Sequence, residues 1–455
     1  MRNLINCACE NCVGCNHCVR VCPIDEANVI TSIRGKNVWK INGKKCIACG
    51  ACIKVCHHGA RHYEDDTELF IRDLERGVKI NVVAAPAAKT NFEAAGGLGR
   101  LLAWLRSMGA QQIFDASLGA DICAWAHLCY IQRNDPKPVI SQHCPVVVNY
   151  LLKHREELVK HLSPIHSPML SMAVYIRKYE KADAKIAALS PCIANAHEFE
   201  AAGFIDYNVT LNKLQELIEA NKIVMPKQDS GFDRFEASLG SLQASHNSFM
   251  ENVDHCIGES FRIDKAEGQC LVYKALDEYA RQPETKLPTF FGAAHCHAGC
   301  HLGTGCRGGG NIFEINTVMN NLRQPTAHLG KKRHRDELFK VFDKKLRLSD
   351  FVRKHTPAPV QSIRISQEDI GEAFAWLGKF DEAAMNFNCG ACGCETCFEM
   401  AERIAKDIAV PSQCMEKAKR EAHWACAEDS NLLKTNLQNL EEFFQKHSVA
   451  EAKSA

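Results

Sequence analysis

Residues 292–306 read GAAHCHAGCHLGTGC and place three cysteines among three histidines. The donors are Cys296, Cys300, Cys306, His295, His297 and His301. Sulfur and nitrogen ligands at this density suit Zn²⁺ or an iron–sulfur cluster, and the stretch alone does not choose between them. It continues the apolar run TFFGAA (289–294), which is typical of a buried strand. The segment therefore predicts a strand that ends at a metal site.

Three further strands of the same kind occur upstream, in INVVAAPA (80–87), PKPVISQHC (136–144) and AKIAALSPC (184–192). Short β-branched runs that alternate with helical patterns are typical of an α/β domain. Cys144, Cys192 and Cys296 stand at or just past the carboxyl ends of their strands. Because ligands bind at that edge of open α/β sheets, the fold could bring these cysteines together. We predict an α/β domain over residues 67–354, with a less regular insertion at 226–288.

An N-terminal segment, residues 1–66, carries a duplicated cysteine motif. The first copy is spaced C-x2-C-x2-C-x3-C-P, and the second has the same spacing with His57 in place of the proline. This is the bacterial two-cluster ferredoxin pattern, in which the fourth cysteine of each run ligates the cluster of the other run. Zinc is the alternative for four thiolates, but the repeated spacing favours 4Fe–4S clusters. The expected ligand sets are Cys12, Cys15, Cys18 and Cys56 for one cluster, and Cys46, Cys49, Cys52 and Cys22 for the other.

A third cysteine group lies in residues 355–415 and is spaced C-x2-C-x4-C-x16-C. Four thiolates at this spacing suit zinc or a 4Fe–4S cluster, and the ferredoxin-like motifs in the same chain favour the cluster. Cys394 is interpreted as a bystander thiol. The segment begins with a linker (355–362) and a capped helix over 365–380. The four expected ligands are Cys389, Cys392, Cys397 and Cys414.

The last residues, 416–455, are helical in composition. An apolar face runs along this tail at the spacing of a short heptad pattern, and it could pair with a partner helix or with a second copy in a homodimer. Its residues are Leu433, Leu437, Leu440 and Phe444.

The composition excludes several classes of protein. The chain has 455 residues, a formal net charge of +1 and no apolar run long enough to span a membrane. We therefore expect no nucleic-acid partner and no membrane association. The first residues lack the apolar core of a secretory signal, which predicts a cytoplasmic protein. In that reducing compartment the 25 cysteines, an odd number, favour metal ligation over disulfides.

Three segments of the α/β region resemble, in order, the signatures of the FeFe-hydrogenase family: SQHCPVVVNYLLK (141–153), SPCIANAHE (190–198) and CHAGCHLGTG (296–305). AAPAA (84–88) and LSPIHSP (162–168) stand where the family contacts its cofactor. The resemblance implies an H-cluster, which is a 4Fe–4S cubane joined to a diiron unit with CO and cyanide ligands. It also implies that Cys144, Cys192, Cys296 and Cys300 hold the cubane, that Cys300 bridges to the diiron unit, and that Ala85 and Pro86 contact the cofactor.

The chain departs from the family around this expected cofactor. His143 stands where prototypes have a proton-carrying cysteine, although an imidazole can also carry protons near neutral pH. Asn195 replaces a lysine that donates to a cyanide, while Ser190 and Ala294 replace flanking methionines. A stretch that is usually rich in carboxylates reads ICAWAHLCYI (122–131). These changes argue against fast turnover without touching the cubane ligands.

The two-cluster ferredoxin start together with the C-terminal cysteine spacing resembles the sensory, non-bifurcating branch of the family, and no PAS domain fits in this chain. The resemblance implies an enzyme that interconverts H2 with protons and electrons, slowly, and that could sense H2 or redox state. Three accessory 4Fe–4S clusters would exchange electrons with a ferredoxin-like carrier or a signalling partner. The residues expected at the chemical step are His143, Asn195, Ser163 and Glu198.

Two alternatives stay open at this point. One is a non-catalytic iron–sulfur protein for electron transfer or redox signalling that lacks the diiron unit. The other is an iron–sulfur reductase of a different small substrate, which the histidine and asparagine at positions 143 and 195 leave open.

Overall fold

The computed structural model describes residues 2–33, 36–93, 97–133, 137–233, 237–242, 244–245, 262–308, 310–327, 330–421 and 438. Contacts divide the chain into two compact units. The first unit comprises Met1–Asn6, Ile41–His57 and Arg61–Gln361, and the second comprises Cys7–Lys40, His58–Ala60 and Ser362–Ala455. This division cuts through the segment 1–66 that the cysteine motifs define. The four apolar tail residues from Leu433 to Phe444 lie outside the described residues.

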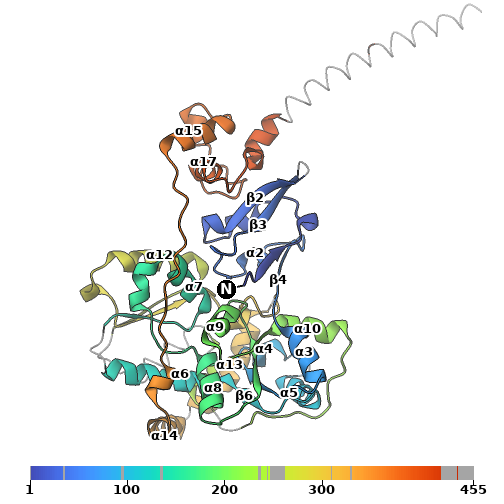
Figure 1. Cartoon of the computed structure of the whole chain (residues 1–455), viewed down its shortest axis with the longest axis vertical. Coiled ribbons are helices and arrows are strands. Elements are labelled where there is room, and N and C mark those ends of the chain that lie inside the picture. The colour runs from blue at the N-terminus through green and yellow to red at the C-terminus, as the bar shows by residue number, and fades with distance from the viewer. Residues whose placement is uncertain are drawn as a thin grey trace, which may run out of the picture. The chain divides into compact units, whose positions relative to one another are not determined.

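A four-stranded parallel sheet lies in the first unit, in the order β6 (Ile113–Asp115), β5 (Ile80–Ala84), β8 (Lys185–Ser190) and β9 (Tyr207–Thr210) (Figure 1). β5 is buried along its whole length, as expected for a central strand with helices on both faces. Val82 joins a core with α3 (Thr67–Glu75), α5 (Leu98–Ser107) and α10 (Leu211–Ala220). Its neighbour Val83 joins the opposite core with α6 (Ala116–Arg133) and α8 (Pro168–Lys178), because successive side chains of a strand point to opposite faces.

A second parallel sheet of three strands has the order β10 (Ile263–Glu267), β11 (Phe290–Ala294) and β7 (Val139–Ile140). The predicted strands therefore exist, but they belong to two sheets. The predicted insertion at 226–288 is regular from Ile263 onward, because it supplies β10 and α12 (Gln269–Arg281). Val272, Leu276 and Tyr279 give α12 a buried face, which accounts for this order in a stretch of mixed composition.

The carboxyl ends of β7, β8 and β11 lead to three of the predicted metal-binding cysteines. Cys144 is the N-cap of α7 (Pro145–His154), and the proline at the first helical position favours a helix start there. Cys192 lies between β8 and α9 (Asn195–Ala202), and Cys296 follows β11 by two residues. The α/β part of the fold thus positions the site at strand ends, as expected for this class.

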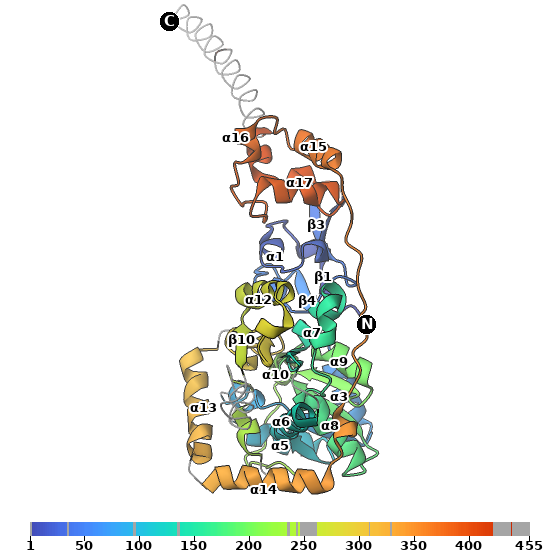
Figure 2. The same cartoon turned by 90° about the vertical axis from the view of Figure 1, so that its left-hand side faces the viewer.

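Figure 2 shows α13 (Ile312–Ala327) and α14 (Gly330–Lys345) on the outside of the first unit. Two short helices, α2 (Ala51–Lys54) and α4 (Ala88–Asn91), belong to this unit as well. A two-stranded sheet pairs β1 (Ile5–Cys7) with β4 (Arg61–Tyr63).

The two ferredoxin-like motifs share an unusual backbone pattern. In the first motif Gly14 and Asn16 flank Cys15 with φ values of 73° and 65°, and in the second Ala48 and Gly50 flank Cys49 with 59° and 75°. Left-handed residues alternating with ordinary ones turn successive N–H groups into a concave cradle that suits anions and Fe–S clusters. The same conformation at equivalent positions supports the duplication that the spacing predicted.

The second unit contains the hairpin-like pair β2 (Asn28–Ile33) and β3 (Lys36–Ile41), with α1 (His17–Arg20), α15 (Gln367–Trp376), α16 (Glu382–Met385) and α17 (Cys397–Ala405). The predicted capped helix is α15, where Ser366 and Asp369 form a reciprocal capping box. The buried Arg403 of α17 donates to the carbonyls of Asp25 (2.6 Å) and Asn28 (3.0 Å). The C-terminal segment therefore packs on the half of the ferredoxin-like region that carries the first motif.

Candidate metal centre

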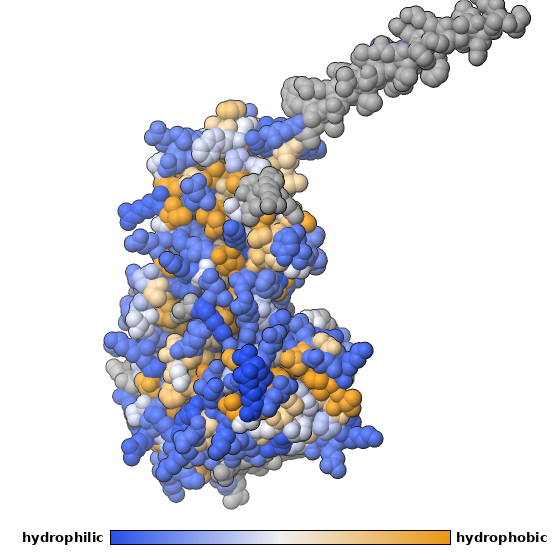
Figure 3. All heavy atoms as spheres, turned by 45° about the vertical axis from the view of Figure 1, so that its right-hand side comes forward, coloured by the Kyte–Doolittle hydropathy of each residue, from blue (hydrophilic) through white to orange (hydrophobic). Residues whose placement is uncertain are grey.

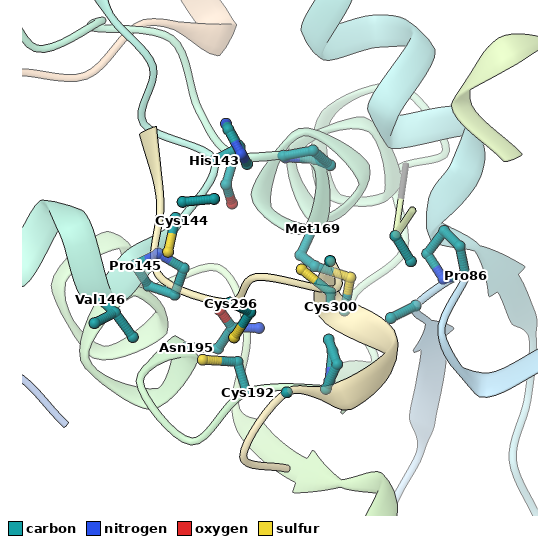
Figure 4. A pocket seen from close by; sticks show the side chains of 18 of the residues that line it. Pro86, His143, Cys144, Pro145, Val146, Met169, Cys192, Asn195, Cys296 and Cys300 are labelled. Carbon is teal, nitrogen blue, oxygen red and sulfur yellow. The ribbon is translucent and has the colours of Figure 1, made fainter. Parts of the chain in front are cut away.

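Four cysteines predicted to hold a metal cluster line one cavity of the first unit: Cys144, Cys192, Cys296 and Cys300. Figure 4 shows their side chains around a common space, with Pro86 and Met169 among the neighbouring walls. The cavity holds about 1040 Å³ that protein atoms do not fill, part of it open to solvent. Three chain segments and both sheets thus contribute thiols to one site.

Burial raises the pKa of each of these thiols. The pKa of Cys296 rises to about 12, and the pKa values of Cys192 and Cys300 lie well above the ordinary 9.0. Repulsion between thiolates is the second cause of the raised pKa of Cys192 and Cys300, since thiolates at Cys144 and Cys296 oppose the ionisation of both. Four thiolates around one mainly apolar cavity need positive charge beside them, which the iron of a cubane would supply. The donor set therefore fits a 4Fe–4S cubane.

A site for a single metal ion requires ligands that lie closer together than the ligands of a cubane. Among the residues that the structure describes, no group of three or more His, Cys, Asp or Glu side chains is arranged to hold one ion. A cubane takes one cysteine on each of four iron atoms, so its ligands lie further apart than the ligands of one ion.

Glycines of the third signature allow two loops of the site to pack closely. A Cβ atom at Gly303 would lie 2.3 Å from the carbonyl oxygen of Pro191, and one at Gly305 would lie 2.8 Å from the Pro191 carbonyl carbon. The Gly305 N–H donates to that oxygen at 2.9 Å. The loop after Cys300 is thereby held against the turn that carries Cys192.

The remaining cavity wall is largely apolar and includes Ala85, Pro86, Ala116, Met169 and Ala294. An apolar wall disfavours water, which would suit a cofactor that carries CO and cyanide ligands. The sequence reasoning missed Met169, although it follows the quoted segment LSPIHSP by one residue. The site keeps a methionine side chain despite the losses at positions 190 and 294.

Asn195 lines this cavity, but its amide is engaged inside the chain. Its Nδ2 donates to Ser190 Oγ at 2.8 Å, and the same oxygen accepts from the backbone N–H of Cys192 at 3.2 Å. Both residues therefore stabilise the turn around Cys192. The second hydrogen of the Asn195 amide is the one that a cofactor ligand would use.

His143 also lines the cavity, next to Cys144. Burial, followed by repulsion from His127, lowers the pKa of His143 to about 4. The cubane's negative charge would oppose this shift, as an anion beside an imidazole favours the protonated form. In the protein alone the imidazole is neutral at neutral pH.

His127 on α6 is a residue that sequence reasoning missed. Its Nδ1 lies 2.8 Å from the Cys123 carbonyl, so Nδ1 carries the proton of the neutral ring. Its Nε2 must then accept from Ser163 Oγ, which lies 2.8 Å away. Burial lowers the pKa of His127 to about 4, which keeps the ring neutral. The only signal was the histidine within ICAWAHLCYI, where carboxylates were expected.

Glu198 lines the cavity as well and forms a buried ion pair. Arg353 Nη2 lies 2.8 Å from Oε1, and Ser167 Oγ donates to Oε2 at 2.8 Å. Burial raises the pKa of Glu198 above its ordinary value, while Arg353 and Ser167 lower it. Nothing in the sequence linked Arg353 to this glutamate, because 155 residues separate them.

The second ferredoxin-like motif lies in the first unit, where α7 contacts its loop. Lys153 Nζ donates to the Cys46 carbonyl at 2.6 Å, and Asn149 Nδ2 donates to the Ile47 carbonyl at 3.1 Å. The Ala48 N–H points at Cys46 Sγ (3.4 Å), a contact typical of cluster ligands. α7 therefore begins at one predicted cluster ligand and holds the loop of another. Cys46, Cys49, Cys52 and Cys56 belong to this unit, and Cys12, Cys15, Cys18 and Cys22 belong to the second.

The C-terminal cysteines line a small pocket of the second unit: Cys389, Cys392, Cys397 and Cys414. Cys394 lines it too, so the bystander of the sequence reasoning is a neighbour of the expected ligands. Lys379 is almost fully buried at this pocket, and its ammonium donates to the Ala384 carbonyl at 2.7 Å. Burial raises the pKa of Cys414, and Lys379 lowers it. The buried ammonium of Lys379 therefore lies at the pocket whose thiols would bind a cluster.

Exposed aromatic side chains surround the same segment, and Figure 3 shows apolar areas among hydrophilic ones on the molecular surface. Phe387, two residues before Cys389, is 58% exposed, and Phe398, next to Cys397, is 46% exposed. Trp376 and Phe380 are exposed as well. Large apolar side chains at a surface commonly mark a contact site.

Protein-family models identify the α/β region. Residues 78–303 match the family described as iron only hydrogenase large subunit, C-terminal domain. The α/β domain of the chain belongs to the FeFe-hydrogenase family. Residues 11–60 of this hydrogenase-family chain match the 4Fe-4S dicluster domain, and residues 386–415 match a family named FeS after an Fe–S cluster. The predicted family and the predicted fold class, an α/β hydrogenase domain with a ferredoxin-like N-terminal domain and a C-terminal iron–sulfur segment, are confirmed.

Solved hydrogenase structures share the fold. An FeFe-hydrogenase studied for oxygen inactivation through its 2Fe subcluster is 14% identical, covers 64% of this chain and 99% of its own, and has a TM-score of 0.50. A variant of HydA1 from Chlamydomonas reinhardtii is 15% identical, with coverages of 64% and 99% and a TM-score of 0.49. No curated protein matches the chain. No helix in the described part of the chain is long and apolar enough to cross a bilayer.

Proposed function

We propose that this member of the hydrogenase family interconverts H2 with protons and electrons at an H-cluster. The observation that supports the proposal is that four thiols, those of Cys144, Cys192, Cys296 and Cys300, line one mainly apolar cavity. When bound, the H-cluster would supply the iron site at which H2 is formed or split. The chain itself would hold this group, exclude water from it and move protons.

Proton transfer to the cavity is the step in which this chain differs most from prototypes. His143 lies at the cavity in place of the usual cysteine, and Ser163 donates to the neutral His127 behind it. Glu198 is bound to Arg353 and Ser167, so protonating it would cost an ion pair. We therefore propose that His143 is the nearest proton carrier, that Ser163 and Glu198 are candidates further along, and that turnover is slow.

A slow enzyme suits a sensory role better than bulk H2 metabolism, and we propose that the chain belongs to the sensory branch of the family. Three accessory 4Fe–4S clusters would carry electrons between the active site and a ferredoxin-like carrier or a signalling partner. The exposed aromatic residues beside Cys389 and Cys397 support a protein contact near the C-terminal cluster. A cytoplasmic location and a homodimer through the tail belong to the same proposal.

Infrared spectroscopy tests the central point. Protein loaded anaerobically with the diiron cofactor should show CO and cyanide bands and produce H2 from a reduced dye. Cys300→Ala should lose those bands, because the same cysteine would join the cubane and the diiron unit. Cys306→Ala is the matched control, since Cys306 is a buried neighbour of Cys300 that is not among the four ligands.

The alternative function has an opposite signature. A redox-signalling protein without the diiron unit would keep the cubane but show no CO or cyanide bands after loading. The buried Asn195–Ser190 bond favours this reading in one respect, because it uses one of the two amide hydrogens that could face a cyanide. Absence of the bands with full iron–sulfur content would replace the hydrogenase proposal by this one.

A further inference from the structure

The loop that follows Cys300 touches the second ferredoxin-like motif directly, within the first unit. Thr304 Oγ1 donates to the backbone carbonyl of Cys49 at 2.5 Å. Lys54, on α2 of the same motif, donates to the Leu302 carbonyl at 2.5 Å. Both contacts join one short segment of the cubane site to one short segment of the accessory cluster site, and both are at the short end of hydrogen-bond lengths.

The two segments meet without a gap. Gly50, next to Cys49, has a φ of 75°, and a Cβ atom built on it would lie 2.0 Å from Thr304 Cγ2. Thr304 is only 8% exposed, so water does not compete for its hydroxyl. Glycine is therefore required at position 50 both for the left-handed backbone and for the close approach.

A continuous bonded route connects the two predicted clusters through this contact. It runs from Cys49 through its carbonyl to the Thr304 hydroxyl, and from Thr304 along one peptide bond to Gly303. The Gly303 N–H donates to the Cys300 carbonyl at 3.0 Å, which shortens the route to that ligand. Electron tunnelling decays more slowly along covalent and hydrogen bonds than across empty space, so such a route favours fast transfer.

We propose that Thr304 is the electron-transfer contact between the cluster on the second ferredoxin-like motif and the cubane. The proposal rests on the proposed function for the presence of both clusters, but it does not need the diiron unit. Thr304 does not touch substrate, so its role is to hold and couple the two cluster loops. The hydroxyl provides the bond, and the methyl group fills the space over Gly50.

Protein made without the diiron unit is the material for the test. A flash-generated reductant would reduce the accessory clusters, and freeze-quench EPR would follow the electron to the cubane. Thr304→Val keeps the shape but removes the donor, and it should abolish the fastest phase of transfer. Thr304→Ser should restore that phase. Thr317→Val is the matched control, because Thr317 donates only within α13, to the Phe313 carbonyl.

Equilibrium measurements separate coupling from driving force. In Thr304→Val the iron content and the reduction potentials of both clusters should match those of the native protein. Gly50→Ala should slow the same phase by pushing the two loops apart, giving a second and independent perturbation. A native transfer rate in Thr304→Val would overturn the assignment, and so would a slow rate in both the valine and serine variants, because packing rather than the hydroxyl would then matter. Absence of a cubane EPR signal in the native protein would refute this proposal and the proposed function together, whereas missing CO and cyanide bands would leave this one standing.

Discussion

The ion pair of Glu198 and Arg353 allows a direct test of the electrostatics of the cavity wall. The side chains are 5% and 14% exposed, and the closest oxygen–nitrogen distance is 2.8 Å. Arg353→Met keeps an apolar stem but leaves the carboxylate with one hydroxyl donor, Ser167. Removing one partner of a buried pair costs about 3–5 kcal/mol. The partial exposure of Arg353 places the expected loss of stability at the lower end, about 3 kcal/mol.

Hydrogen exchange measures this loss locally. The His166 amide donates to the Phe351 carbonyl at 2.8 Å and is protected only while the segment containing Arg353 stays in place. A loss of about 3 kcal/mol should speed its exchange at neutral pH by about 10²-fold, since every 1.4 kcal/mol is tenfold. Arg307→Met is the control, because Arg307 and Glu219 are both 54% exposed and such pairs contribute about 1 kcal/mol at most.

The pH dependence of hydrogen exchange and a second substitution show whether the unpaired charge of Glu198 causes the loss of stability. Burial already raises the pKa of Glu198, and loss of Arg353 should raise that pKa further. A carboxyl whose folded pKa is raised costs stability while it is ionised, so the exchange defect should shrink as the pH falls through that pKa. Glu198→Gln in the Arg353→Met background should also reduce the defect. A defect that persists at low pH and in the double variant would refute the charge explanation.

Three further outcomes are expected. Anaerobic protein made without maturation enzymes should hold about 16 iron atoms, and about 18 with the diiron unit. Cys397→Ser should remove one EPR-detectable cluster. Stoichiometric zinc in the protein would contradict the assignment of a 4Fe–4S cluster to the C-terminal cysteines. His143→Ala should lower H2 evolution by about 10²-fold with the infrared bands retained, and full activity combined with a loss in Glu198→Gln would transfer the role to the carboxylate. The full chain should lose stability in urea titrations as the pH falls from 6.5 toward 4, at about 4 kcal/mol per pH unit, and a flat profile would contradict it. That loss would come from three histidines outside the cysteine loops that are neutral in the folded protein, because desolvation lowers their pKa values from 6.5 to about 4: His127, His166 and His355.

The parts of the site that were predictable from sequence are those encoded by local patterns. Cysteine spacing identified the ferredoxin-like motifs, and apolar runs that end at Cys144, Cys192 and Cys296 located the site at strand ends. The division of these strands into two sheets was not predictable, because strand pairing depends on contacts between distant segments. β7 has only two residues, too few to show a pattern of its own.

The hydrogen-bond and ion-pair partners of the polar residues could not be predicted from the sequence either. Ser163 was a candidate because of its segment, but its bond to His127 depends on how α6 packs against the loop before α8. Arg353 donates to Glu198 across 155 residues of sequence, and Arg403 donates to the Asn28 carbonyl across 375 residues. No periodicity or spacing rule predicts such contacts, so these ion pairs and hydrogen bonds became visible only in the structure.

Cluster-binding cysteines that follow strands of two separate sheets would have a consequence for the lifetime of the protein. Cys192 belongs to the four-stranded sheet, and Cys144 and Cys296 follow strands of the three-stranded sheet. A cubane bound to all three would cross-link the two sheets, and such a bond adds metal affinity to the free energy of folding. Oxygen damage that dissolves the cubane would then release the sheets from each other and expose the chain to proteolysis.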